Sequence, residues 1–209
     1  MSVTVTGMDG QAEHWNAAYA SGDRGRSWYQ EHALTSMRLI GERGAASDSV
    51  LDVGGGASTL VDDLNVAGYR DVTVLDISTT SLAIAQDRLG DQSGSVTWVE
   101  ADLLTWEPSR TFSIWHDRAV LHFFTNADQK GAYRNVLMKA TRSGSIAVIG
   151  VFGPDGPTHC SGLPVQRYDD GSMARLLSSA FTVTSSVLHG HRTPGGAVQQ
   201  FMWSRAVRE

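Results

Sequence analysis

From Ser49 onward the chain alternates between short β-rich runs and segments with helical periodicity, and this alternation constrains the fold more than any other feature. The β-rich runs fall at residues 50–53, 72–77, 96–99, 112–115 and 145–151. Strands separated by helices of roughly ten to fifteen residues form βαβ units, whose strands run parallel and are covered on both faces. Each crossover is expected to be right-handed. The pattern therefore predicts an α/β fold built on a mostly parallel sheet.

The end of the chain breaks this alternation. Two β-rich stretches, 181–189 and 197–207, are joined by only the short segment 191–196. A link this short cannot cross over a sheet, so the pair is predicted to be an antiparallel hairpin. Residues 1–46 precede the sheet, and their apolar spacing predicts helices near 12–20 and 31–43.

Composition limits the classes of function. The chain has 209 residues, 41% of them hydrophobic, and a formal net charge of −5. That length predicts a single domain over 1–209, with a helical cap segment at 1–46 and a core at 49–207. The negative charge gives no electrostatic support for binding nucleic acid or an anionic membrane. The single cysteine, Cys160, excludes an internal disulfide and a multi-thiolate metal site. Without a recognisable signal peptide or spanning segment, a cytoplasmic location is expected.

A glycine-rich loop, Asp52-Val53-Gly54-Gly55-Gly56-Ala57-Ser58, lies between the first predicted strand and the first helix of the sheet region. Open α/β sheets bind their ligands at this position. Glycine lets the backbone approach a ligand closely and adopt positive φ angles. A tight turn without a ligand is the alternative interpretation.

Acidic residues follow the predicted strands. Asp76 ends the second strand twenty residues after Gly56, where a carboxylate can accept hydrogen bonds from both hydroxyls of a ribose. The pair Asp102-Leu103 follows the third strand and is placed to read an adenine edge, and Asp117 ends the fourth. A single acid at a strand end is more often a capping or surface residue. Together with Asp52, however, the four predict a nucleoside-binding edge.

These motifs resemble those of the class I S-adenosylmethionine (SAM)-dependent methyltransferases, over roughly residues 49–205. Asp52, Gly54 and Gly56 match the acid and alternating glycines of their loop, and Ser58 stands at the third glycine position. The resemblance implies a Rossmann-like, seven-stranded sheet of order 3-2-1-4-5-7-6, whose last strand is reversed. It implies SAM as cofactor, with Asp76 on the ribose, Asp102 and Leu103 on the adenine, and Asp117 near the methionine end. The cofactor-binding residues predicted in this way are Tyr19, Trp28, Asp52, Gly54, Gly55, Gly56, Ser58, Asp76, Ile77, Asp102, Leu103 and Asp117.

An NAD(P)-dependent oxidoreductase is the main rival for the same loop. Its G-x-G-x-x-G/A pattern requires Gly or Ala where this chain has Thr59. No Tyr-x-x-x-Lys pair occurs, and the only lysines are Lys130 and Lys139. The methyltransferase interpretation is therefore preferred.

The N-terminal segment carries a second resemblance. Trp15 to Asp23, followed by Ser27-Trp28-Tyr29-Gln30, resembles the first helix of a methyltransferase subgroup with small-molecule and protein-lysine enzymes. In that subgroup the segment folds over the cofactor. An amphipathic helix that uses Trp15 and Tyr19 as core anchors explains the same pattern, and the two interpretations are compatible.

Methyl transfer is an in-line displacement, so the protein must align the acceptor, exclude water and, where needed, remove a proton. The run after the fourth strand offers the catalytic candidates Asp117, Arg118 and His122. His122 is the preferred base because imidazole titrates near neutral pH, with a structural histidine as the alternative. Arg118 either orients an anionic acceptor or pairs with Asp117, and the pair is preferred.

The acceptor is expected to be a small molecule, since only the N-terminal segment and the loop at 153–168 remain to shape its pocket. Tyr29, His159 and Cys160 are the substrate-binding candidates, with a plain lid surface as the alternative for the last two. The seven histidines form no compact ligand motif, so no metal site is predicted. A protein-lysine N-methyltransferase and an inactive SAM-binding protein remain the alternative functions. The sequence indicates neither the acceptor atom nor the oligomeric state.

Overall fold

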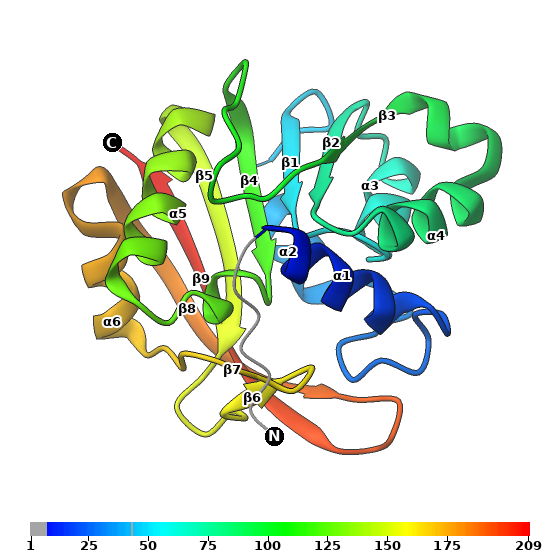
Figure 1. The fold of residues 1–209 in the computed structure, drawn as a ribbon. Helices are drawn as coiled ribbons and strands as arrows, with labels where there is room; N and C mark the ends of the chain where they lie inside the picture. Colours follow the sequence, from blue (N-terminus) through cyan, green and yellow to red (C-terminus); the bar gives the residue numbers. More distant parts are fainter. Residues whose placement is uncertain (1–7, 43) are drawn as a thin grey trace.

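A single seven-stranded sheet forms the centre of the molecule in the computed structural model, which describes residues 8–42 and 44–209 (Figure 1). Its strands are β1 (Ser49–Val53), β2 (Asp71–Asp76), β3 (Val96–Glu100), β4 (Phe112–Arg118), β5 (Thr141–Phe152), β8 (Phe181–Arg192) and β9 (Val198–Arg208). They lie in the order β3-β2-β1-β4-β5-β9-β8. The first five pair in parallel, whereas β9 is antiparallel to both β5 and β8. The predicted fold class and strand order are confirmed.

Helices and short connections cover the sheet. The α-helices are α1 (Met8–Tyr19), α2 (Leu34–Gly41), α3 (Leu60–Val66), α4 (Thr79–Leu89), α5 (Ala127–Ala140) and α6 (Asp170–Leu177). The 3-10 helices are η1 (Gly90–Ser95), η2 (Leu121–Phe123) and η3 (Ser178–Ala180), and a small hairpin pairs β6 (His159–Cys160) with β7 (Leu163–Pro164). Ser78 and Asn126 cap α4 and α5 by accepting hydrogen bonds from backbone N–H groups of the first turn.

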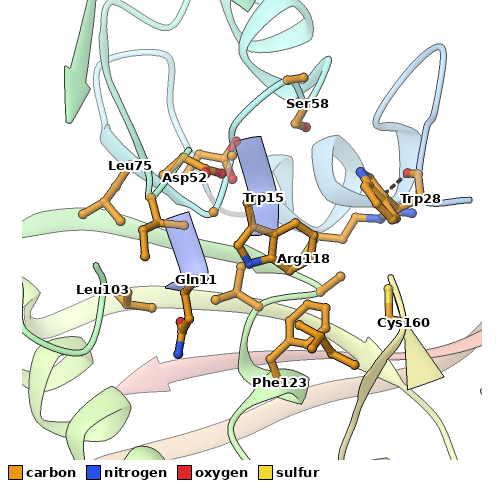
Figure 2. A pocket seen from close by; sticks show the side chains of 18 of the residues that line it. Gln11, Trp15, Trp28, Asp52, Ser58, Leu75, Leu103, Arg118, Phe123 and Cys160 are labelled. Carbon is orange, nitrogen blue, oxygen red and sulfur yellow. Dashed lines mark hydrogen bonds between the residues drawn. The ribbon is translucent and has the colours of Figure 1, made fainter. Parts of the chain in front are cut away.

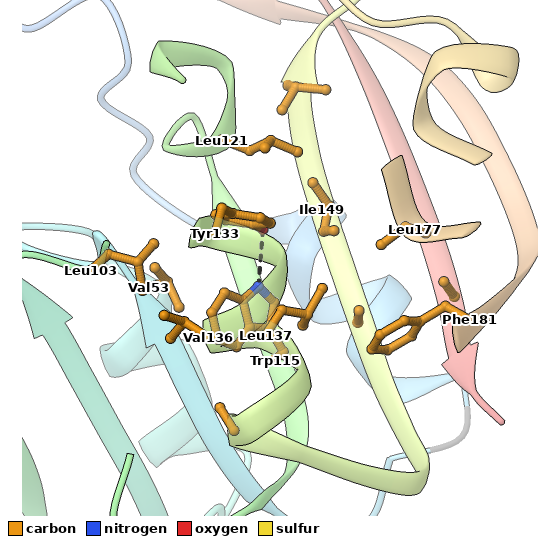
Figure 3. Close-up of a cluster of buried hydrophobic side chains, with 14 of the residues drawn as sticks. Val53, Leu103, Trp115, Leu121, Tyr133, Val136, Leu137, Ile149, Leu177 and Phe181 are labelled. Atoms are coloured by element: carbon orange, nitrogen blue, oxygen red, sulfur yellow. Dashed lines mark hydrogen bonds between the residues drawn. The ribbon is translucent and has the colours of Figure 1, made fainter. Parts of the chain in front are cut away.

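Two hydrophobic cores lie on opposite faces of the sheet. One packs α5 and α6 against the sheet, and the other packs α2 and α3 against its reverse side. Alternation along β4 sends Trp115 to the first core and Ile114 to the second. In the first core the fully buried Trp115 donates a hydrogen bond from Nε1 to Tyr133 Oη at 3.2 Å (Figure 3).

Several boundaries differ from prediction, and local contacts explain two of the differences. Strand β5 begins at Thr141, directly after α5, because Arg142–Gly144 form an irregular start to the strand and not a separate turn. The pairing with β4 shifts register there, between Phe112 and Ile114. Helix α2 begins at Leu34, later than the predicted start at 31, since Asp63 Oδ2 accepts a hydrogen bond from Ala33 N at 2.7 Å and fixes the chain before the helix. Residue 43, the predicted end, lies outside the described residues.

Within the described residues, no helix combines the length and apolar character that crossing a membrane would require. The first seven residues of the predicted cap segment lie outside the described part of the chain.

Candidate active site

A cavity of about 480 Å³ opens at the carboxyl ends of β1, β2 and β4. Helix α1 lies across these strand ends, and the β6–β7 hairpin lies beside them (Figure 1). The predicted site residues that line the cavity are Tyr19, Trp28, Tyr29, Asp52, Gly54, Gly55, Ser58, Asp76, Ile77, Asp102, Leu103, Arg118 and Cys160. Gly56, Asp117, His122 and His159 are not among its lining residues.

The glycine loop is shaped by lack of space for side chains. Gly54 has φ +61°, and a Cβ atom built on it would lie 2.1 Å from Val120 Cγ2. A Cβ atom on Gly55 would lie 2.5 Å from Asp52 Oδ2, and one on Gly56 would lie 2.6 Å from Asp76 Oδ2. Gly55 and Gly56 therefore let the loop pack onto the carboxylates of Asp52 and Asp76, and Gly54 lets it pack against Val120.

Asp52 is held at the end of β1 by a buried hydrogen-bond chain. His116 Nδ1 lies 2.7 Å from Asp52 Oδ1, and His116 Nε2 lies 2.9 Å from Ser36 Oγ on α2. All three side chains are buried. The other carboxylate oxygen, Oδ2, is buried without a hydrogen-bond partner among the described residues. A buried acceptor is costly to leave unpaired, so this oxygen is suited to a ligand donor.

Asp76 is the acid at the end of β2. Its Oδ1 accepts a hydrogen bond from Ser78 N at 2.8 Å, and Ser81 also donates to the carboxylate. Burial nevertheless raises its pKa from 3.8 to about 6, because desolvation outweighs these hydrogen bonds. Asp102, after β3, accepts from Leu104 N through Oδ1 at 2.9 Å.

Helix α1 closes the cavity with aromatic side chains. Trp15 makes edge contacts with Phe123 and Trp28, at centroid distances of 5.1 and 6.0 Å. Trp28 Nε1 donates a hydrogen bond to Tyr19 Oη at 2.9 Å, and burial raises the pKa of Tyr19. The N-terminal segment therefore acts both as a packed helix and as a wall of the cavity.

Polar contacts tie α1 to two other parts of the site. Asn16 Oδ1 accepts hydrogen bonds from Ser78 Oγ at 2.8 Å and Thr80 N at 3.1 Å, at the start of α4. His14 Nε2 lies 3.2 Å from Ser161 Oγ, between β6 and β7. The helix thus connects the acid-lined half of the cavity to the hairpin.

The contacts of Arg118 differ from the preferred prediction of a pair with Asp117. No ion pair with Asp117 exists in the described structure; Nη1 of Arg118 donates instead to the backbone oxygen of Trp28 at 2.8 Å. Its guanidinium carbon lies 5.0 Å from the Phe201 ring centroid. Alternation along β4 explains the difference, because adjacent side chains point to opposite faces of the sheet.

Asp117 and His122 lie outside the cavity lining. Strand β4 continues through Arg118, so Asp117 is still within the strand. Its carboxylate accepts hydrogen bonds from Val120 N and Leu121 N, directly after the strand, and from Tyr133 of α5. His122 is completely buried between Phe123 and Phe152, and neither ring nitrogen has a hydrogen-bond partner in residues 8–42 and 44–209. Burial lowers the pKa of His122 to about 3. This placement fits the structural alternative for His122.

The substrate candidates lie in different environments. Tyr29 and Cys160 line the cavity, and burial raises the pKa of the Cys160 thiol to about 11. His159 is exposed, and its Nδ1 lies 3.2 Å from Thr158 Oγ1. Of the predicted lid residues, Cys160 is therefore the one that faces the cavity.

Several lining residues had not been singled out as site residues. Gln11 and Trp15 line the cavity two turns and one turn before Tyr19, so the four-residue spacing on one helix face was an available signal. Phe123, Asn126 and Gln129 also line it. The contact between His116 and Ser36 spans 80 positions in the chain, and no local pattern indicates it.

Comparison with known proteins supports the methyltransferase interpretation of the sequence. Residues 50–144 match a family model described as a methyltransferase domain. The mouse eEF1A lysine and N-terminal methyltransferase is 23% identical over 143 residues, which are 68% of this chain and 20% of the mouse protein. The chain thus spans about a fifth of the length of that relative.

Solved structures share the fold at low identity. A SAM-dependent methyltransferase from Anabaena variabilis aligns over the whole of both chains with a TM-score of 0.78 at 12% identity. The Burkholderia thailandensis 1,6-didemethyltoxoflavin-N1-methyltransferase, with its substrate and S-adenosylhomocysteine bound, aligns over 100% of this chain and 93% of its own, with a TM-score of 0.72 at 20% identity. Residues 50–144 therefore match a methyltransferase domain, and the chain shares the fold of solved SAM-dependent methyltransferases.

Proposed function

We propose that this chain transfers a methyl group from SAM to a small-molecule acceptor. One observation carries the proposal: a glycine loop and the acids Asp52, Asp76 and Asp102 all border one cavity at the carboxyl edge of the sheet. This is the location at which open α/β sheets bind ligands.

The residues present fit the cofactor. The unpaired Oδ2 of Asp52 is buried and borders the cavity, as an acceptor for the cofactor's amino group requires. Asp76 is assigned to the ribose hydroxyls. Asp102 and the backbone at Leu103 are assigned to the adenine. Side chains on Gly54 or Gly55 would clash with their neighbours, so the loop is suited to close backbone approach.

Methyl transfer from SAM needs no covalent intermediate with the protein. SAM supplies an activated methyl group, which the acceptor's lone pair attacks as the carbon–sulfur bond breaks and its electron pair stays on sulfur. The aromatic cluster of Trp15, Trp28 and Phe123 excludes water from this region and restricts the acceptor's orientation. Neither Asp117 nor His122 lines the cavity, so the proposal assigns neither of them contact with the acceptor.

A small acceptor is favoured by the enclosure of the site, because α1 and the β6–β7 hairpin both border the cavity. Methylation of a protein is the second candidate, supported by the similarity to the mouse eEF1A methyltransferase. A lysine ammonium approaching this cavity would meet the guanidinium of Arg118, and like charges at close range disfavour that approach.

Calorimetry with SAM and S-adenosylhomocysteine tests the first step, and saturable binding of both is expected. A radiolabelled-methyl assay then compares a fractionated small-molecule extract with lysate protein as acceptors. Label in the small-molecule fraction is expected, while label confined to protein bands would replace the small-molecule proposal with the protein one. Failure to bind either cofactor form would refute both.

A further inference from the structure

We propose that the acceptor is a small, flat organic anion whose negative group binds the guanidinium of Arg118. This inference rests on the proposed methyl transfer and adds the class of acceptor. It begins from the distribution of charge around the cavity. Within the described part of the chain, Arg118 is the only lysine or arginine that lines it.

Along the sheet edge, in the order β3-β2-β1-β4, the charged lining residues change from the acids Asp102, Asp76 and Asp52 to the base Arg118. Asp76 and Asp102 stand at the β2 and β3 ends of the sheet edge, where the nucleoside is assigned. Arg118 leaves the end of β4, reaches towards Trp28, and lies opposite Leu75 and Leu103 (Figure 2). The guanidinium packs on Phe201 of the more distant strand β9. Arg118 therefore belongs to the end of the cavity that the nucleoside does not fill.

The guanidinium is incompletely paired. Arginine carries five N–H donors, and the one hydrogen bond that Arg118 makes to the described residues is that from Nη1 to the Trp28 backbone oxygen. Nη2 is buried and has no partner there. Burial lowers the pKa of Arg118 to about 10, although the negative charge of Asp52 opposes this shift, and Arg118 stays charged at neutral pH. A buried, charged donor set that is not hydrogen-bonded to an anion is costly unless a ligand supplies one.

The surroundings of Arg118 define the rest of the acceptor. Trp28 supplies the backbone oxygen that holds Nη1 and also one ring of the aromatic cluster with Trp15 and Phe123. Flat apolar groups pack well against aromatic faces and edges. Cys160 lies at the same end (Figure 2), and its raised pKa keeps it neutral, so it does not compete as an anion. An aromatic acid combines the two features that this end of the cavity recognises.

The anion at Arg118 has two possible sources, the acceptor and the carboxylate of the cofactor's own methionine. Binding of two compounds related to the cofactor distinguishes these sources. S-adenosylhomocysteine carries the carboxylate, and 5′-methylthioadenosine lacks it. If Arg118 serves the acceptor, R118M should change the affinity for both compounds by the same factor, since loss of the contact with Trp28 would affect both alike. Weakened binding of S-adenosylhomocysteine alone would assign the anion to the cofactor and overturn the proposal.

The decisive experiment is titration calorimetry on protein saturated with S-adenosylhomocysteine. The probes are benzoate, salicylate and 2-naphthoate, each compared with its uncharged amide. At least one acid should bind the wild type about tenfold or more tightly than its amide, and R118M should lose that preference. R118K, which keeps the charge but not the planar donor fork, should retain part of it. Equal binding of every acid and its amide by the wild type overturns the proposal. This comparison uses the wild-type protein alone, so it does not depend on the folding of any variant. Absence of S-adenosylhomocysteine binding by the wild type would instead refute the proposed function.

Discussion

His116 Nδ1 lies 2.7 Å from Asp52 Oδ1 in the interior of the sheet, 64 positions apart in the chain. The imidazole also contacts Ser36 Oγ through Nε2 at 2.9 Å. Asp52 thus has one oxygen held by the protein and one, Oδ2, without a partner among the described residues. This arrangement makes His116 a positioning residue for the carboxylate that faces the cofactor side of the cavity.

Replacing His116 tests this positioning. H116L leaves the buried Asp52 carboxylate without its donor, so unfolding free energy should fall by about 1–3 kcal/mol, together with a loss of S-adenosylhomocysteine affinity. H116N keeps an N–H donor near Nδ1 and should lose less of both. Urea unfolding and calorimetry measure the two quantities. Equal cofactor affinity in H116L and the wild type would argue that His116 serves stability alone.

The glycine loop gives a prediction based on space. G55A places a methyl group 2.5 Å from Asp52 Oδ2 and 2.8 Å from Val74 Cγ1, so the loop must shift and cofactor binding should be lost. Gly131 is the matched control, because it lies exposed within α5 and a Cβ atom there meets nothing within 4 Å. G131A should raise stability by about 0.5–1 kcal/mol and leave binding unchanged. Calorimetry and chemical unfolding of both variants provide the comparison, and normal binding by G55A would contradict the steric argument.

Helix α1 is fixed over the cavity by Asn16. N16A removes the acceptor for Ser78 Oγ and Thr80 N, so hydrogen exchange of the α1 amides should accelerate and cofactor affinity should decrease. N16D retains an acceptor oxygen and places a negative charge at the N-terminus of α4, which is favourable there. It should therefore resemble the wild type in both measurements. Unchanged exchange in N16A would mean that the packing of Trp15 alone holds the helix.

The fold was predictable because its determinants are local. The alternation of strands and helices predicts parallel pairing, and the short 191–196 link permits only a hairpin. The gathering of Asp52, Asp76 and Asp102 at one cavity was also predictable, since the ends of parallel strands meet at one edge. Asp117 was the exception because β4 continues through Arg118, and alternation along the strand points Asp117 away from the cavity that Arg118 lines.

The acceptor side was less predictable because it depends on contacts between distant segments. His122 follows β4 in a stretch that suits a catalytic loop, yet packing against Phe152 buries it completely. Arg118 and Asp117 are adjacent in sequence, but Arg118 bonds to Trp28, 90 positions away. Burial and partner choice at such distances follow from tertiary packing, and a single sequence does not encode them in a readable local pattern.

The proposed contact of Asp76 with the ribose predicts that cofactor binding depends on pH. Its pKa is about 6 in the folded chain and 3.8 ordinarily, so the folded unliganded state holds the proton more tightly than the unfolded state does. The resulting contribution to stability is present below pH about 4 and is lost as pH rises through about 6. Ribose binding has the opposite pH dependence, because only the ionised carboxylate can accept hydrogen bonds from both ribose hydroxyls. Affinity for S-adenosylhomocysteine should therefore rise about tenfold between pH 5 and pH 7.

Two variants separate Asp76 from the other acid that titrates in this range. D76N has no ionisable group, so its affinity should be weaker at pH 7 and should not rise with pH. Burial also raises the pKa of Asp117 to about 6, but Asp117 faces α5 and does not line the cavity. D117N should therefore keep the pH dependence of binding, whatever it does to stability. Calorimetric affinities at pH 5, 6 and 7 distinguish the two, and a rise that persists in D76N would assign the pH dependence to a group other than Asp76.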